Sequence, residues 1–138
     1  MLDEIILYVP NVPGQLKMAL KALAEGQVNL LAFSLEQAGP YGIVRLIADD
    51  LERAEEQLRK HAFGLLKTKV FAIAMPHKPG ALQDVTEALA AEGINIEYGY
   101  VAMPRKTTEA IILLKINREE EARALFREKG IQDLDEIR

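Results

Sequence analysis

Two short segments of the 138-residue chain combine residue types and spacing suited to holding a small anion. Residues 10–16 and 76–82 share one pattern, in which a Pro is followed by two residues, then Pro-Gly, one further residue and Leu. An apolar run precedes each pattern and a helix-like pattern follows it. The first turn of a helix has N–H groups without intrahelical partners, and its positive dipole end attracts negative charge. We therefore expect two loops that each bind a small anion, such as the carboxylate of an amino acid.

The residue types in these loops indicate how a ligand would be held. Gly14 and Gly80 have no Cβ, so a ligand can approach their backbone closely. The N–H groups of the two residues after each Gly are the expected donors to a carboxylate, and the Asn11 side chain is an expected acceptor for an ammonium group. Pro-Gly also occurs as a plain turn, and the alternative for His77 is an exposed loop residue without contact to a ligand. The candidate ligand-binding residues are Asn11, Val12, Pro13, Gly14, Gln15, Leu16, Asn29, Leu30, His77, Lys78, Pro79, Gly80, Ala81, Leu82, Asn95 and Ile96.

Polar and aromatic residues in two later strand-like runs extend this candidate set. Asn29 and Asn95 occupy equivalent places early in these runs. Each either contacts a ligand from a facing unit or bonds the backbone of the turn before the strand. Tyr98 and Tyr100 fall on one face of their strand, where they either line a pocket or pack between units. The sequence leaves these alternatives open.

Apolar spacing and turn residues predict the elements that position the loops. Helices are expected after each Pro-Gly, and also after Asp49-Asp50 and Asn117, which are expected helix caps. Residues 103–108 are expected to form a polar turn. Strands are expected at 5–9, 28–35, 43–48, 94–101 and 110–116, with two strands joined at 65–75 and a short one within 131–137.

The order strand, helix, strand, strand, helix, strand therefore occurs twice. Residues 10–29 align with 76–95 without gaps and share eight identical residues. The second halves align with an offset that is two residues longer, which places an insertion in the 103–108 turn. An internal duplication explains this pattern. We expect an α+β fold of two ferredoxin-like βαββαβ units, 1–68 and 69–138, each an antiparallel four-stranded sheet with its helices on one face.

A βαββαβ unit with Pro-Gly-x-Leu between its first strand and first helix resembles the ACT domain, a small regulatory module that binds amino acids. Residues 11–16, 77–82 and 91–98 carry the resemblance, which covers nearly the whole chain and is similar to tandem ACT proteins without an enzyme domain. It implies an amino-acid-binding regulatory protein with ligands at interfaces between ACT units. Many ACT domains place Asp or Asn two residues before the motif Pro; Asn11 keeps this pattern and His77 departs from it. The two loops therefore need not bind one ligand equally.

Composition argues against several other classes of protein. The net charge of −4 and the absence of aromatic residues from the central strand runs disfavour nucleic acid as a partner. Zero Cys excludes thiolate metal sites and cysteine nucleophiles. We find no catalytic residues, metal ligands or cofactor motif, and the loops lack the Arg of the acylphosphatases, which share this topology. No apolar run is long enough for a membrane span, and we expect a cytoplasmic protein.

These observations predict a non-catalytic regulatory protein that binds a free amino acid where the loop of one unit meets the early strand of another. We expect a homodimer, because paired sheets leave edges and helix faces to cover. A metabolic enzyme is a possible partner. The alternative is a regulatory subunit that holds such an enzyme by protein contacts and binds no small molecule itself.

Overall fold

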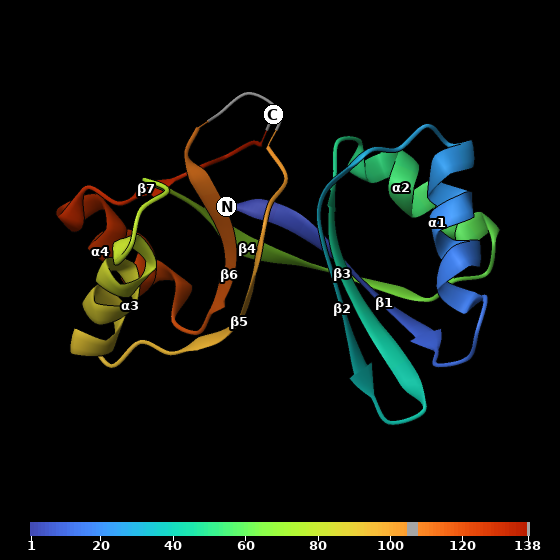
Figure 1. Ribbon diagram of the computed structural model, residues 1–138, viewed down its shortest axis with the longest axis horizontal. Coiled ribbons are helices and arrows are strands. Elements are labelled where there is room, and N and C mark those ends of the chain that lie inside the picture. The colour runs from blue at the N-terminus through green and yellow to red at the C-terminus, as the bar shows by residue number, and fades with distance from the viewer. Residues whose placement is uncertain (105–107, 138) are drawn as a thin grey trace. The chain divides into compact units, whose positions relative to one another are not determined.

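The computed structural model describes residues 1–104 and 108–137 (Figure 1). Residues 105–107 of the expected 103–108 turn lie outside the described residues. The predicted fold class is confirmed, because the βαββαβ order occurs twice with antiparallel pairing. The elements are β1 (Leu2–Pro10), α1 (Gln15–Glu25), β2 (Leu30–Ala38), β3 (Tyr41–Ala48), α2 (Leu51–Lys60), β4 (Leu65–Met75), α3 (Ala81–Ala91), β5 (Ile96–Val101), β6 (Ala110–Ile116), α4 (Glu119–Lys129) and β7 (Gln132–Asp133).

The chain divides into two compact units. The first unit is Asp3–Thr68, and the second is Lys69–Arg138 together with Met1–Leu2. The strand order is β2-β3-β1-β4 in the first unit and β5-β6-β4-β7 in the second. Strand β4 belongs to both units, as expected for a run that joins two strands. Both units thus have the strand order of a ferredoxin-like sheet.

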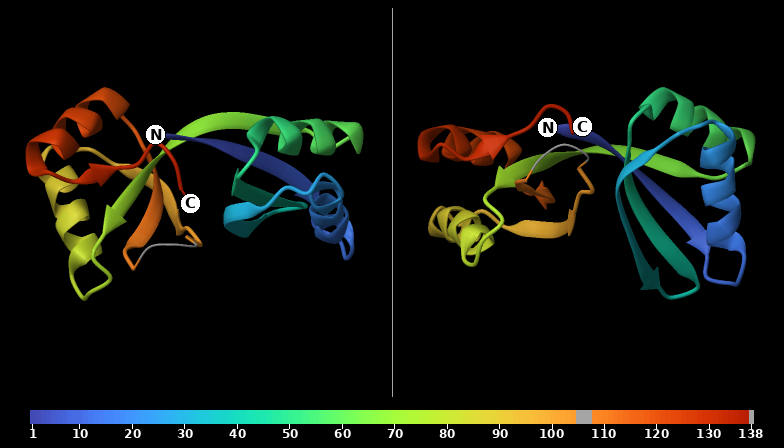
Figure 2. Two further views of the ribbon diagram at one scale, coloured as in Figure 1. Left: turned by 90° about the horizontal axis from the view of Figure 1, so that it is seen from above. Right: turned by 45° about the horizontal axis from the view of Figure 1, so that its top comes forward.

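Alternating apolar residues build the core of the first unit. Ile5, Leu7 and Val9 of β1 point to one face, where they pack against both helices of the unit. Figures 1 and 2 show α1 and α2 together on this side of the strands. The core residues are Ile5, Leu7, Val9, Ala19, Leu23, Val28, Val44, Leu46, Ala54 and Leu58.

An ion-pair cluster joins α2 of this unit to the beginning of β4. The Lys67 Nζ lies 2.9 Å from one carboxylate oxygen of Glu55, and the Arg59 Nε lies 3.1 Å from the other. Lys67, followed by Arg59, holds the pKa of Glu55 below its usual value. Because the group is at the surface, we expect the cluster to orient Lys67 rather than to add much stability.

The second unit repeats this arrangement with larger side chains. Phe71 and Ile73 of β4 face α3 and α4, where Phe126 is buried. The Phe71 and Phe126 rings meet edge to face, with centroids 5.2 Å apart and planes at 86°. This geometry is favourable for aromatic pairs. The remaining buried residues of this core are Met75, Ala81, Val85, Leu89, Ile94, Leu114, Ile116, Ala122 and Leu125.

The sequence predicts a side-chain cap at the beginning of α2 and another at the beginning of α4. The first prediction is confirmed and the second is wrong. Asp50 caps α2 as expected, because its carboxylate accepts a hydrogen bond from the Arg53 N–H at 3.0 Å. In the second unit the N-cap of α4 is Arg118, and Asn117 does not cap the helix. The Asn117 Oδ1 instead accepts from the Asn95 N–H at 2.9 Å. A partner 22 residues away outcompetes the local cap.

The equivalent contact in the first unit supports the duplication and its insertion. There the Asp49 Oδ1 accepts from the Asn29 N–H at 2.9 Å, across 20 residues. The Asp49 and Asn117 N–H groups return hydrogen bonds to the Asn29 and Asn95 carbonyls at 3.0 and 3.2 Å. The same two-way contact therefore spans two more residues in the second unit, as an insertion in the β5–β6 connection requires.

Gly99 lies where β5 and β6 leave no room for a side chain. An added Cβ would lie 2.8 Å from the Leu114 Cδ2 and 3.0 Å from the Leu113 carbonyl oxygen. We expect Gly99→Ala to lower the free energy of unfolding by about 1–3 kcal/mol, because backbone and core must shift. Urea denaturation of the two proteins measures this difference.

Gly64→Ala is the matched control, since no atom lies within 4 Å of an added Cβ there and the backbone needs no positive φ. This control is expected to change stability by no more than about 0.5 kcal/mol. Equal stability of Gly99→Ala and the wild type would contradict the described β5–β6 packing.

Among the described residues, no helix has the length and apolar character needed to cross a membrane.

Candidate functional site

The two predicted loops have the same backbone conformation. Gly14 and Gly80 are the N-cap residues of α1 and α3, with φ values of +89° and +86°. Such φ values favour glycine. Neither N-cap makes a side-chain hydrogen bond to its helix, and no atom lies within 4 Å of an added Cβ at either glycine. Each helix therefore begins at an open, uncapped glycine.

The donors available in each loop are fewer than the sequence predicts. The Gln15 N–H donates to the Val12 carbonyl at 3.3 Å, and the Ala81 N–H donates to the Lys78 carbonyl at 3.4 Å. These long bonds close a turn before each helix and engage two of the four expected donors. The second residue of each helix, Leu16 or Leu82, is in the first turn, where no intrahelical acceptor exists. Its N–H is the best-placed donor of each loop.

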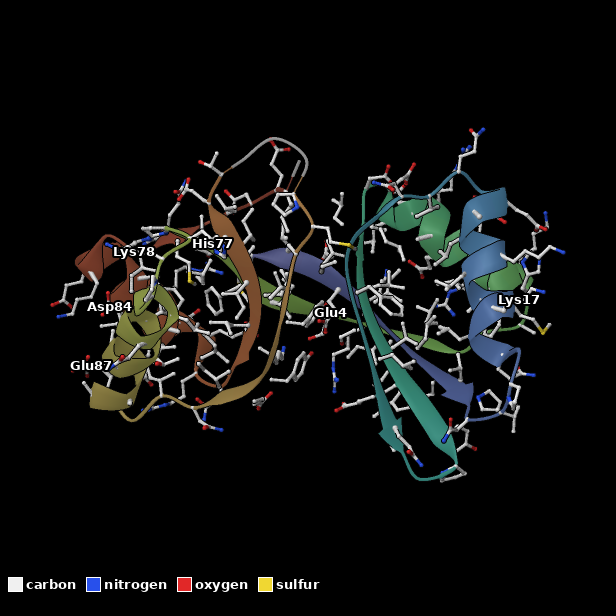
Figure 3. The ribbon with its side chains drawn as sticks, in the orientation of Figure 1. Glu4, Lys17, His77, Lys78, Asp84 and Glu87 are labelled. Atoms are coloured by element: carbon white, nitrogen blue, oxygen red, sulfur yellow. The ribbon has the colours of Figure 1, made fainter. Side chains whose placement is uncertain are left out.

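The two loops differ in the charges that surround this common backbone. The first loop has the neutral residues Asn11 and Val12 where the second has His77 and Lys78, all of them exposed. The first turn of α1 has no acidic residue, whereas α3 has Asp84 in its first turn. Figure 3 shows His77 and Lys78 beside the beginning of α3 and Asp84 further along the helix. An acidic first-turn residue competes with a bound anion for the positive end of the helix.

A backbone contact fixes the first loop against its own sheet. The Asn11 N–H donates to the Pro40 carbonyl in the β2–β3 turn at 2.9 Å. Pro10 pairs with Tyr41, and Tyr41 pairs with Ala38 at the end of β2. The loop and this turn therefore share one end of the first unit, and the loop is held at its first residue.

The residues at the beginning of β2 and β5 lie far from the loop of their own unit. Strands β1 and β2 are both antiparallel to β3, so they run in the same direction. Leu30, which follows Asn29, pairs with Ala48 at the opposite end of the sheet from Pro10. Ile96, which follows Asn95, pairs with Ile116, whereas Met75 before the second loop pairs with Ala110. One unit does not bring the two halves of the predicted site together, so the predicted site requires a second unit.

Comparison with known proteins gives this geometry a context. The family model described as an ACT domain pair matches residues 1–137. The chain belongs to this family. This match confirms the expected resemblance. ACT domain pairs are regulatory modules. No curated protein matches the sequence of this ACT domain pair at a significant level.

Solved structures resemble this ACT domain pair over most of its length. Protein BT0572 of Bacteroides thetaiotaomicron has 28% sequence identity and a TM-score of 0.88, covering 96% of this chain and 91% of that one. The ligand-free regulatory subunit of aspartate kinase from Thermus thermophilus has 20% identity and a TM-score of 0.61, covering 91% and 90%. Aspartate kinase from Synechocystis has 20% identity and a TM-score of 0.55, covering 93% of this chain and 25% of that one. The two kinase proteins share the fold.

The tyrosines considered as pocket residues of the ACT domain pair share one face of β5. Tyr98 and Tyr100 pair with Lys115 and Leu113, while Gly99 between them pairs with Leu114 of the helix-facing core. The two tyrosines therefore point to the sheet face opposite α3. Tyr100 is buried and Tyr98 is half-buried, which is consistent with packing.

Asp49 and Asn117 are polar residues whose role the sequence analysis missed. They hold the turns that precede β2 and β5, where the candidate residues Asn29 and Asn95 lie. The sequence did hold a signal for this role, because Asp49 and Asn117 occupy equivalent positions in the duplication. In residues 1–104 and 108–137, no cluster of three or more His, Asp or Glu side chains is arranged to hold a metal ion.

Proposed function

We propose that this ACT domain pair is a non-catalytic regulatory protein that binds a free amino acid at the loops containing residues 11–16 and 77–82. The observation that supports the proposal is the repeated open glycine at the beginning of a helix. Gly14 and Gly80 share a positive φ and have free space around them, and neither helix has a side-chain cap. A ligand carboxylate can supply the missing acceptor.

Each end of an amino acid has a chemical counterpart in this proposal. The carboxylate accepts from the Leu16 or Leu82 N–H and gains from the positive end of the helix. The ammonium group donates to the Asn11 side chain or to loop carbonyls. Because Asn29 and Leu30 lie at the far end of their own unit, any contact from them comes from another unit. The same holds for Asn95 and Ile96.

Such a ligand would couple binding to the arrangement of units. A molecule that touches the loop of one unit and the strand of another stabilises the arrangement in which both contacts exist. A partner enzyme that recognises this arrangement is then regulated by the amino acid. We place this function in a cytoplasmic homodimer that acts on a metabolic enzyme.

The two loops are expected to bind with unequal affinity. Lys78 adds a positive charge to the second loop, and Asp84 adds a negative charge to the first turn of its helix. Val12 and Met18 occupy the equivalent positions of the first loop, where both side chains are exposed. The first loop therefore suits a ligand with an apolar side chain, and the second suits one that carries a further charge.

A thermal-shift screen against the twenty common amino acids and related carboxylates tests the proposal. A ligand present at a hundred times its Kd adds about 2.7 kcal/mol of stability. For a chain of this size, that corresponds to a rise in Tm of roughly 5–10 °C. A rise limited to a few chemically related amino acids is the expected result. If no compound raises Tm, the protein acts through protein contacts alone, and capture of its partner becomes the next experiment.

A further inference from the structure

A cleft in the second unit lies between α4 and the segment that contains β7. Its volume is about 420 Å³, which is within the range of small-molecule sites. Its lining combines apolar residues, such as Phe126 and Ile131, with charged ones. The lining residues are Met1, Arg123, Phe126, Arg127, Ile131, Gln132, Asp133 and Asp135.

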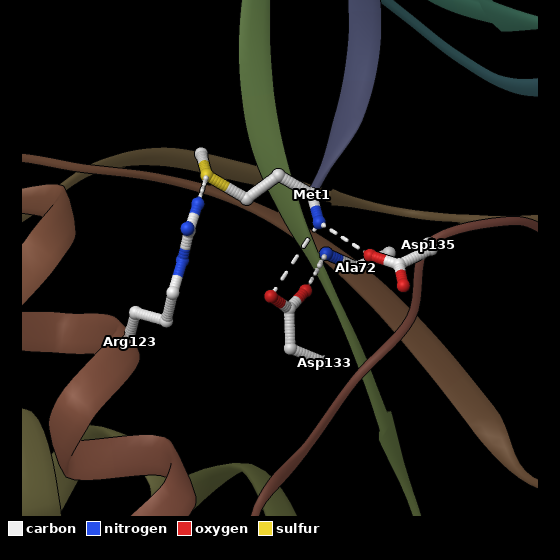
Figure 4. A network of polar contacts seen from close by, with 5 residues as sticks. All are labelled: Met1, Ala72, Arg123, Asp133 and Asp135. Carbon is white, nitrogen blue, oxygen red and sulfur yellow. Dashed lines mark hydrogen bonds and ion pairs between the residues drawn. The ribbon is translucent and has the colours of Figure 1, made fainter.

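Two guanidinium groups that line this cleft have no carboxylate partner in the described part of the chain. Arg123 and Arg127 are four residues apart on α4, so they lie on one side of the helix. The Arg123 Nη2 lies 3.1 Å from the Met1 sulfur, which is a weak acceptor (Figure 4). In the part of the chain that the structure describes, neither Arg forms an ion pair with an Asp or Glu. Most of their N–H donors are therefore available to a ligand.

The two carboxylates of the cleft contact Met1, which also lines it. The Met1 α-amino group lies 3.5 Å from the Asp133 Oδ2 and 3.4 Å from the Asp135 Oδ1. The Asp133 Oδ1 also accepts from the Ala72 N–H at 3.4 Å (Figure 4). The two carboxylates of the cleft are thus paired with Met1, whereas Arg123 and Arg127 have no Asp or Glu partner among the described residues. Guanidinium groups without a carboxylate partner favour an anion.

We propose that this cleft binds a small anion with several oxygen atoms, which Arg123 and Arg127 hold together. The planar guanidinium donates two parallel hydrogen bonds to a carboxylate or phosphate, and two such groups enclose one anion. This site is separate from the glycine loops, because none of its lining residues belongs to residues 10–16 or 76–82. A carboxylate and a phosphate present the same chemistry here, and the experiment distinguishes them.

Calorimetric titration of the full chain with sodium phosphate and with sodium succinate tests the proposal, with sodium chloride keeping the ionic strength constant. We expect saturable binding of at least one probe, and the tighter probe identifies the anion class. The double variant Arg123→Gln/Arg127→Gln is expected to raise Kd at least tenfold. Lys129→Gln is the matched control, because Lys129 is a cation of the last turn of α4 that does not line the cleft.

Asp135→Asn is expected to change the affinity for the anion in the direction opposite to that of the double Gln variant. The Asp135 side chain is 96% exposed, so its replacement leaves the fold intact, and loss of its negative charge is expected to tighten anion binding. Absence of saturable binding in the wild type would overturn the proposal. So would equal affinities of the wild type and the double Gln variant, or an equal loss in Lys129→Gln. Substitutions at Gly14 and Gly80 are expected to leave this titration unchanged, which separates it from the amino-acid loops.

Discussion

Replacing Phe126 with Ala is expected to lower the free energy of unfolding by about 3–5 kcal/mol. Phe126 is 1% exposed, and its ring meets the fully buried Phe71 ring at a centroid distance of 5.2 Å. The substitution removes this contact and leaves a cavity between α4 and the sheet. Such a loss is a large part of the stability of a typical domain. Urea denaturation followed by circular dichroism measures it.

Phe126→Leu is the control for this prediction. Leu keeps most of the apolar volume but loses the edge-to-face contact, so the expected loss is much smaller than for Ala. A loss below about 1 kcal/mol for Phe126→Ala would contradict the position of Phe126 at the centre of the second core.

Substitution of Gly14 and Gly80 by Asp is expected to raise the Kd of the amino acid at least tenfold relative to substitution by Asn. The two side chains have the same shape, and both tolerate a positive φ better than other residues do. Both have room, since no atom lies within 4 Å of either added Cβ. Only Asp brings a negative charge close to the helix N-terminus, where it repels the ligand carboxylate.

The comparison of Asp with Asn removes the effect of backbone strain. Each substitution costs about 1 kcal/mol of stability because φ is positive, and this cost is common to both variants. The single variants Gly14→Asp and Gly80→Asp show which loop contributes more to binding. Equal affinities of the double Asp and double Asn variants would indicate that the ligand carboxylate does not lie at these loops.

Local patterns in the sequence were sufficient to predict the fold. Pro10 and Gly14 mark where β1 ends and α1 begins, and their counterparts do the same in the second unit. The apolar run from Ile5 to Val9 predicts a strand that ends at Pro10, which β1 confirms. The duplication strengthened each of these weak signals, because the same pattern had to be explained twice.

Contacts between residues distant in sequence were beyond this reasoning. Asn117 looked like a helix cap, but it accepts a hydrogen bond from Asn95, which lies 22 residues earlier. The α4–β7 cleft depends on Met1 reaching Asp133 across 132 residues, and no spacing rule reports such a contact. The engagement of the Gln15 and Ala81 N–H groups in turns was also missed, because it depends on the φ values of the loops.

Amide chemical shifts of the ¹⁵N-labelled protein, followed during titration with the amino acid that the thermal screen selects, test the central claim most directly. A carboxylate that accepts a hydrogen bond changes the environment of its donor N–H. We therefore expect the Leu16 or Leu82 amide to move downfield and to saturate at the concentration that saturates the Tm rise. Unchanged Leu16 and Leu82 signals, with shifts confined to residues such as Gln132 and Asp133, would contradict the proposed loop site.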